Sequence, residues 1–120
     1  MRDRLEQLLG ELVARDSVNP AWNAGPGEKG VAEFIASELT KAGLKPTVQD
    51  IGSGRANVVA TISGAGSAQS VLLNAHMDVV GTEDMDDPFS QRREGDKLYG
   101  RGAYDMKGSA AIMLALAEHF

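Results

Sequence analysis

One histidine and two aspartates carry the chemistry that this sequence offers. His76 and Asp78 lie in the segment VLLNAHMDVV, directly after an apolar run that begins at Val71. Residues two apart in an extended chain project to the same side, so Asp78 is placed to hold the His76 ring. A histidine that binds a metal needs such an acceptor on its second ring nitrogen. The alternative is a strand-end histidine that hydrogen-bonds an aspartate in a turn.

The second aspartate, Asp105, lies in the segment GRGAYDMKGS. Gly100 and Gly102 allow the backbone to turn tightly and to approach a ligand closely. A carboxylate just ahead of a helix is also a common helix cap. The two glycines and the strand-like KLY before them favour a more constrained site. We expect the nearby cations, Arg101 and Lys107, to be solvated or to form local salt bridges.

Composition limits the kind of site and the kind of partner. The sequence has no cysteine, so a metal site must use histidine and carboxylates. It has 17 acidic and 12 basic residues and no Lys/Arg cluster, which argues against nucleic-acid binding. Its longest apolar stretch, Ala110–Ala117, is far shorter than the roughly 20 residues of a membrane span. The charged N-terminus MRDRLEQLLGEL lacks secretory-signal features. We expect a cytoplasmic protein.

Three helices are expected to frame the site, over residues 4–15, 28–42 and 108–120. Apolar residues recur with helical spacing in the first, which contains Leu5, Leu8, Leu9, Leu12 and Val13. Gly43 follows the second as a left-handed stop. The third is apolar almost all round, so it should be buried on most sides. The chain stops at Phe120 without a helix terminator, and we expect a truncated chain.

Strands are expected at Thr47–Ile51, Ala56–Ile62 and Val71–Ala75. The last is a continuous apolar run, which is typical of a strand buried on both faces in an α/β sheet. The carboxyl ends of such strands are where ligands bind, and His76 follows at that position. The sequence therefore predicts an α/β fold in one domain, with a central sheet flanked by helices.

Taken together, the two motifs resemble a known family. HMDVV, followed 29 residues later by the Asp of GRGAYDMKG, is similar to the di-zinc amidohydrolases and metallopeptidases that include acetylornithine deacetylase, succinyl-diaminopimelate desuccinylase, aminoacylase and glutamate carboxypeptidase. The intervening DPFSQRREGDKLYGRG is also similar to that family. The resemblance covers essentially the whole chain. It implies that residues 1–120 are the N-terminal part of the catalytic domain, without the dimerisation domain.

The resemblance also implies a role for each site residue. His76 would bind one metal ion, Asp78 would brace the His76 ring as the catalytic-site aspartate, and Asp105 would bridge two metal ions. A non-proline cis bond is implied at Asp105–Met106. The cofactor would be two zinc ions, with cobalt or manganese as alternatives. The family's dimerisation domain is compatible with a homodimer of the complete enzyme.

The implied reaction is hydrolysis of an amide next to a free carboxylate. Deacylation of an N-acyl-amino acid is the first choice, and a dipeptidase or carboxypeptidase acting on a short peptide is the alternative. A non-catalytic α/β fragment or binding module is the rival of another class. The family also needs a Glu-Glu pair, a further acidic ligand and a distant histidine beyond the glycine motif. We therefore expect this chain alone to bind metal weakly and not to hydrolyse amides.

Overall fold

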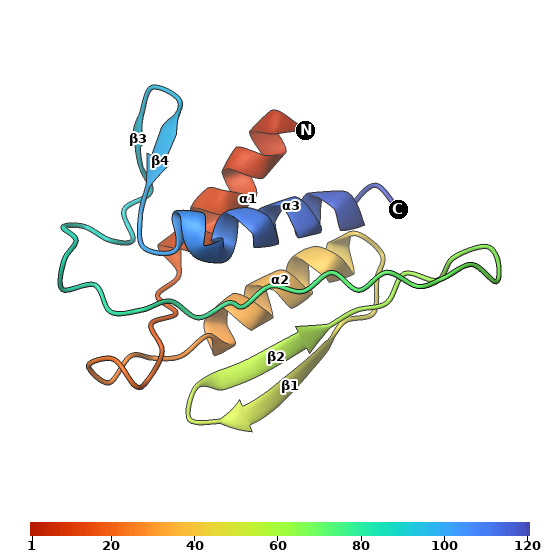
Figure 1. Ribbon diagram of the computed structural model, residues 1–120, viewed down its shortest axis with the longest axis horizontal. Coiled ribbons are helices and arrows are strands. Elements are labelled where there is room, and N and C mark those ends of the chain that lie inside the picture. The colour runs from red at the N-terminus through yellow and green to blue at the C-terminus, as the bar shows by residue number, and fades with distance from the viewer.

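The computed structural model describes residues 1–120 as three helices, two hairpins and a long extended segment (Figure 1). The helices are α1 (Arg2–Ala14), α2 (Lys29–Lys41) and α3 (Gly108–Ala117), and a short π-helical turn, η1 (Ala103–Lys107), leads directly into α3. The strands are β1 (Thr47–Gly52), β2 (Arg55–Val59), β3 (Arg92–Glu94) and β4 (Lys97–Tyr99). The expected mixed α/β class, with helices beside the strands, is confirmed.

The hydrophobic core lies where the three helices meet. Each helix contributes the residues that its apolar spacing places on one side, namely Leu8, Leu12, Val31, Ile35, Ala110, Ala111, Leu114 and Ala115. All three helices were predicted, and their ends differ from the predicted ones by at most three residues. Burying this many apolar side chains is the main source of stability for a chain of this size.

The predicted stop of α2 is also confirmed. Gly43 adopts a left-handed conformation with φ of 86°. Its N–H donates to the carbonyl of Thr40 at 2.9 Å, and the N–H of Leu44 donates to the carbonyl of Leu39 at 3.0 Å. These bonds satisfy carbonyls that the helix end would otherwise leave open.

The predicted central sheet is not formed within these residues. β1 pairs with β2 and β3 pairs with β4, both antiparallel, and the two hairpins are separate two-stranded sheets. The β1–β2 hairpin lies beside α2, and the β3–β4 hairpin projects from the opposite side of the molecule (Figure 1). β2 ends at Val59 rather than at Ile62.

The strand predicted at Val71–Ala75 is wrong for this chain. The segment is extended but forms no backbone hydrogen bond, and Val71 and Leu72 are 84% and 87% exposed. The apolar run correctly predicted an extended conformation. A β-strand, however, also needs a neighbouring strand with which its backbone N–H and C=O groups form hydrogen bonds. Within residues 1–120 the one strand-like contact nearby is a parallel bridge between Val18 and Val79.

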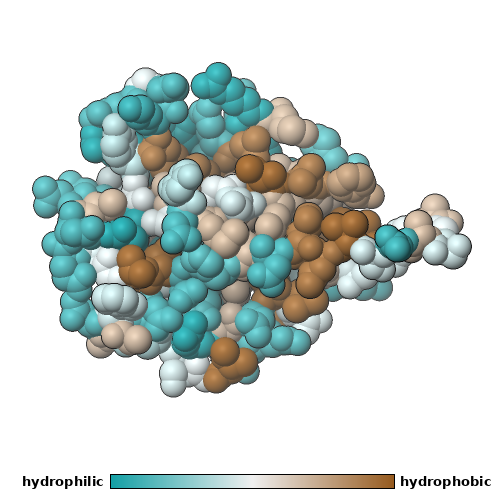
Figure 2. Space-filling view, in the orientation of Figure 1, coloured by the Kyte–Doolittle hydropathy of each residue, from teal (hydrophilic) through white to brown (hydrophobic).

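Apolar surface remains along the extended segment and on one side of α3. Figure 2 shows hydrophobic side chains gathered on the face that the extended segment crosses. Ile112 of α3 is 52% exposed, so the expected burial of this helix on most sides holds only for its inner face. None of the helices is long and apolar enough to cross a membrane.

Candidate metal centre

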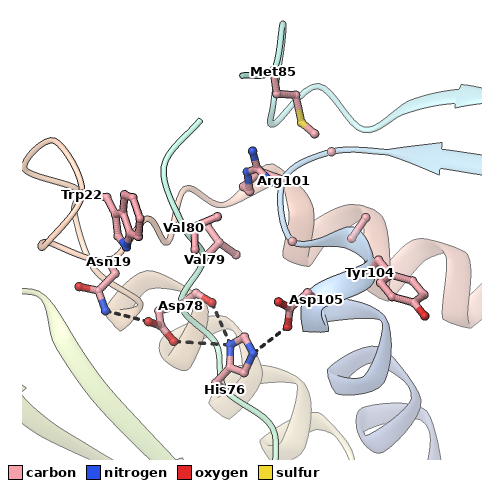
Figure 3. Close-up of a pocket in the computed structure, with 13 residues that line it drawn as sticks. Asn19, Trp22, His76, Asp78, Val79, Val80, Met85, Arg101, Tyr104 and Asp105 are labelled. Carbon is pink, nitrogen blue, oxygen red and sulfur yellow. Dashed lines mark hydrogen bonds and ion pairs between the residues drawn. The ribbon is translucent and has the colours of Figure 1, made fainter. Parts of the chain in front are cut away.

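The three predicted site residues lie together in one open cavity (Figure 3). His76 and Asp78 come from the end of the extended segment, and Asp105 comes from η1. Nε2 of His76 lies 2.9 Å from Oδ1 of Asp105. The cavity has a volume of about 530 Å³, so the two side chains meet in a space that a small ligand can enter.

The other ring nitrogen of His76 faces Asp78, but in a way that the sequence did not predict. Nδ1 of His76 lies 3.0 Å from the main-chain oxygen of Asp78 and 3.5 Å from its carboxylate Oδ1. The main-chain carbonyl of Asp78 is therefore the nearer acceptor for Nδ1, and the carboxylate of Asp78 is the more distant one. Because a carbonyl only accepts, Nδ1 must carry the proton of this hydrogen bond.

With the proton on Nδ1, a neutral His76 presents a bare lone pair on Nε2. That lone pair faces Oδ1 of Asp105, which is also an acceptor. Two acceptors at this distance attract only when a proton or a cation lies between them. A histidine nitrogen and a carboxylate oxygen form a donor set that suits zinc. The residues present therefore fit a metal ion at this position.

Asp105 owes its position to an irregular backbone. Gly102 precedes η1 with φ of 80°, a conformation that glycine adopts without steric cost. The Asp105–Met106 peptide bond is cis, as the family resemblance implied. The Asp105 side chain is 80% exposed, so its carboxylate is open to the cavity and to solvent.

Asp78 is held by residues that the sequence analysis missed. Nδ2 of Asn19 donates to Oδ2 of Asp78 at 2.8 Å, and Nη2 of Arg55 lies 3.7 Å from the same oxygen. Arg55 in turn forms an ion pair with the buried Glu28 at 3.0 Å. No local signal identifies Asn19, because it meets Asp78 across 59 residues of sequence.

The predictions for the neighbouring cations were correct for one and wrong for the other. Arg101 forms a local ion pair with Asp84. Lys107 is only 1% exposed, and its Nζ donates to the carbonyl of Arg15 at 2.9 Å. Burial lowers the pKa of Lys107 to about 8, because the charged form loses its water. The mistake arose because burial of this lysine depends on the end of α1, which is distant in sequence.

The number of metal ligands in these residues is limited. No group of three or more His, Cys, Asp or Glu side chains is arranged to hold one ion. The second histidine, His119, is exposed at the end of α3 and lies outside the cavity. His76 and Asp105 are therefore the two side chains that could share an ion here.

The sequence is similar to known hydrolases over nearly all of its length. Residues 72–120 match the pattern of peptidase family M20/M25/M40. The chain is 43% identical over 118 residues to succinyl-diaminopimelate desuccinylase of Xylella fastidiosa, covering 94% of this chain and 29% of that protein. It is 36% identical to the same enzyme of Xanthomonas campestris (95% and 29%), and 36% identical to a probable one of Staphylococcus aureus (93% and 27%). The chain thus spans less than a third of the length of these relatives.

Proposed function

We propose that this chain supplies part of the metal centre of an amide hydrolase of peptidase family M20/M25/M40, because residues 72–120 match the pattern of that family and nearly the whole chain is similar to succinyl-diaminopimelate desuccinylases. The proposed substrate is an N-acyl-amino acid, with the amide next to a free carboxylate. The relatives' name describes removal of a succinyl group, which supports deacylation over peptide cleavage.

The observation that carries this proposal is the contact between His76 and Asp105. Nε2 of His76 and Oδ1 of Asp105 lie 2.9 Å apart, and Nδ1 of the same ring is fixed by the carbonyl of Asp78. With a proton on Nδ1, the Nε2 lone pair and this carboxylate oxygen are close enough to bind one cation together. We propose that zinc occupies it, with Asp105 able to share a second ion through its other oxygen.

The chemistry of amide hydrolysis explains why such a site is useful. A bound zinc ion would lower the pKa of a water molecule to about 7 and polarise the substrate carbonyl. His76 contributes a neutral ligand whose direction is set by Asp78. Asp105 contributes negative charge beside the position of the cation. With two ligands, the chain falls short of the three protein ligands that catalytic zinc sites use, so we propose weak binding and no turnover by residues 1–120 alone.

Zinc titration of the 120-residue chain tests the proposal. Zinc at a hundredfold excess over its Kd should stabilise the folded chain by about 2.7 kcal/mol, measured by thermal unfolding. His76→Ala and Asp105→Ala should each abolish most of this gain. His119→Ala and Asp96→Ala are matched controls, because both residues are exposed and lie outside the cavity, and both variants should keep the gain.

One result would count against the metal-centre proposal, and another would count against the proposed inactivity of residues 1–120 alone. Equal stabilisation of the wild type and of His76→Ala would place zinc elsewhere and favour a non-catalytic binding module. Turnover of an N-acetyl-amino acid by the chain, abolished by a chelator, would show that two ligands are enough.

A further inference from the structure

The short segment Ser17–Asn19 holds the backbone immediately after His76. The N–H of Val79 donates to the carbonyl of Ser17 at 3.0 Å, and the N–H of Asn19 donates to the carbonyl of Val79 at 2.9 Å. The hydroxyl of Ser17, which is fully buried, donates to the carbonyl of Met77 at 2.8 Å. Three hydrogen bonds therefore fix residues 77–79 against a loop that is distant in sequence.

These bonds determine where the carbonyl of Asp78 points. That carbonyl and the N–H of Val79 belong to one planar trans peptide unit, so they point in opposite directions. Because the N–H of Val79 is directed at Ser17, the carbonyl of Asp78 is directed away from Ser17. This is the carbonyl that accepts from Nδ1 of His76 at 3.0 Å.

Two groups, the amide of Asn19 and the guanidinium of Arg55, attract the same carboxylate oxygen of Asp78. Asn19 donates to Oδ2 at 2.8 Å, whereas the Arg55 guanidinium is still 3.7 Å away from that oxygen. Without the amide of Asn19, the carboxylate is free to turn toward Arg55 and form a closer ion pair. Oδ1, now 3.5 Å from Nδ1 of His76, would then move away from the ring.

We propose that Asn19 is a positioning residue, whose amide holds the Asp78 carboxylate on the Nδ1 side of His76. The negative charge there, together with the Asp78 carbonyl that the Ser17 bond orients, favours a proton on Nδ1 and leaves Nε2 to face Asp105. The inference rests on the proposed metal centre for its functional meaning, although its structural part is testable without metal. Direct hydrogen-bond partners of a metal-binding histidine typically contribute about 10–100-fold to metal affinity, and Asn19 acts through one such partner, Asp78.

Asn19→Ser is the variant that isolates the amide. Oδ1 of Asn19 also accepts from the N–H of Ala21 at 2.9 Å, which shapes the loop. Serine keeps a short oxygen for that bond, but its hydroxyl lies about where Cγ of Asn19 lies, one bond short of the amide nitrogen that reaches Asp78. Asn57→Ser is the matched control, because Asn57 is exposed on β2 and does not line the cavity.

Nitrogen NMR of the histidine rings in zinc-free protein gives the first readout. At about pH 8, Nδ1 of His76 should carry a proton in the wild type and in Asn57→Ser, because the carbonyl of Asp78 accepts from it. Asn19→Ser should lower the proton occupancy of Nδ1 of His76 toward that of the exposed His119, which serves as an internal reference, because the Asp78 carboxylate then leaves the Nδ1 side of the ring. Unchanged His76 resonances in Asn19→Ser would overturn the inference.

Zinc calorimetry in a double-mutant cycle gives the second readout. Asn19→Ser should weaken zinc binding at least about tenfold when Asp78 is present, and have no effect in the Asp78→Ala background. Equal losses in both backgrounds would refute an action through Asp78. If the wild type binds zinc no better than His76→Ala, the proposed function fails, whereas the NMR comparison still decides the role of Asn19.

Discussion

Gly102 offers the sharpest test of how the two halves of the site are held together. It lies between Val79, next to Asp78, and the turn that carries Asp105. A methyl group at this position would lie 2.4 Å from Cγ1 of Val79 and 3.5 Å from the carbonyl oxygen of Asp105. Gly102→Ala should therefore push the two segments apart and lengthen the contact between His76 and Asp105.

Gly102→Ala is expected to lower the free energy of unfolding through two effects that add. A left-handed φ of 80° costs an L-residue about 1–2 kcal/mol. Overpacking against a buried valine costs about 1–3 kcal/mol more. The sum is about 2–5 kcal/mol, to be measured by denaturant unfolding of the zinc-free chain and accompanied by weaker zinc binding.

Gly43→Ala is the matched control for the conformational part. Gly43 has φ of 86°, but a methyl group there would meet nothing within 4 Å. This variant should lose only about 1–2 kcal/mol and keep its zinc affinity. Val79→Ala in the Gly102→Ala background should recover part of the overpacking cost, because it removes the clashing methyl group. If Gly102→Ala costs no more than Gly43→Ala, the close approach of the two segments is not what constrains the site.

Two further predictions concern the helices. Gly30→Ala should stabilise the chain by about 0.5–1 kcal/mol in urea unfolding, because Gly30 is an exposed helical residue with nothing within 4 Å of the new methyl group. Burial alone would raise the pKa of Glu38. Hydrogen bonds from Lys41 and Arg4, each at 2.5 Å, lower this pKa by more than burial raises it, so the net shift is downward. Its ionised form therefore stabilises the fold above the ordinary carboxyl pKa, and this contribution is lost as the pH falls through the lowered pKa. Glu38→Gln should cost about 1–3 kcal/mol at neutral pH and progressively less in acid, measured as unfolding free energy against pH.

The helices were predictable because their signals are local. The apolar spacing around Leu8 and Leu12 determines which side of α1 is buried, and Gly43 ends α2 through its own backbone conformation. The strand at Val71–Ala75 was not predictable in the same way. Its apolar run favours an extended backbone, but pairing requires a neighbouring strand, and none reaches it within residues 1–120.

In the candidate site, too, some residues could be predicted from the sequence and others depend on tertiary contacts. His76, Asp78 and Asp105 could be predicted to lie together because their two motifs, at this spacing in the sequence, resemble those of a known family. Asn19 and Lys107 were missed or misread because their environments are created by tertiary contacts. Asn19 meets Asp78 across 59 residues, and Lys107 meets the carbonyl of Arg15 across 92.

The unpaired segment before His76 has a thermodynamic consequence for the metal centre. Residues 71–76 form no backbone hydrogen bond, whereas the N–H of Val79 is bonded to Ser17. Amide hydrogen exchange should therefore be fast for residues 71–76 and slow at Val79. The proposed metal ligand His76 thus lies at the boundary between unpaired and hydrogen-bonded backbone. Immobilising each backbone residue costs about 1–2 kcal/mol of conformational entropy. A strand that paired with residues 71–76 would immobilise them before zinc binds, and zinc affinity would rise although the strand does not contact the ion. By linkage, bound zinc would favour the docking of that strand to the same extent.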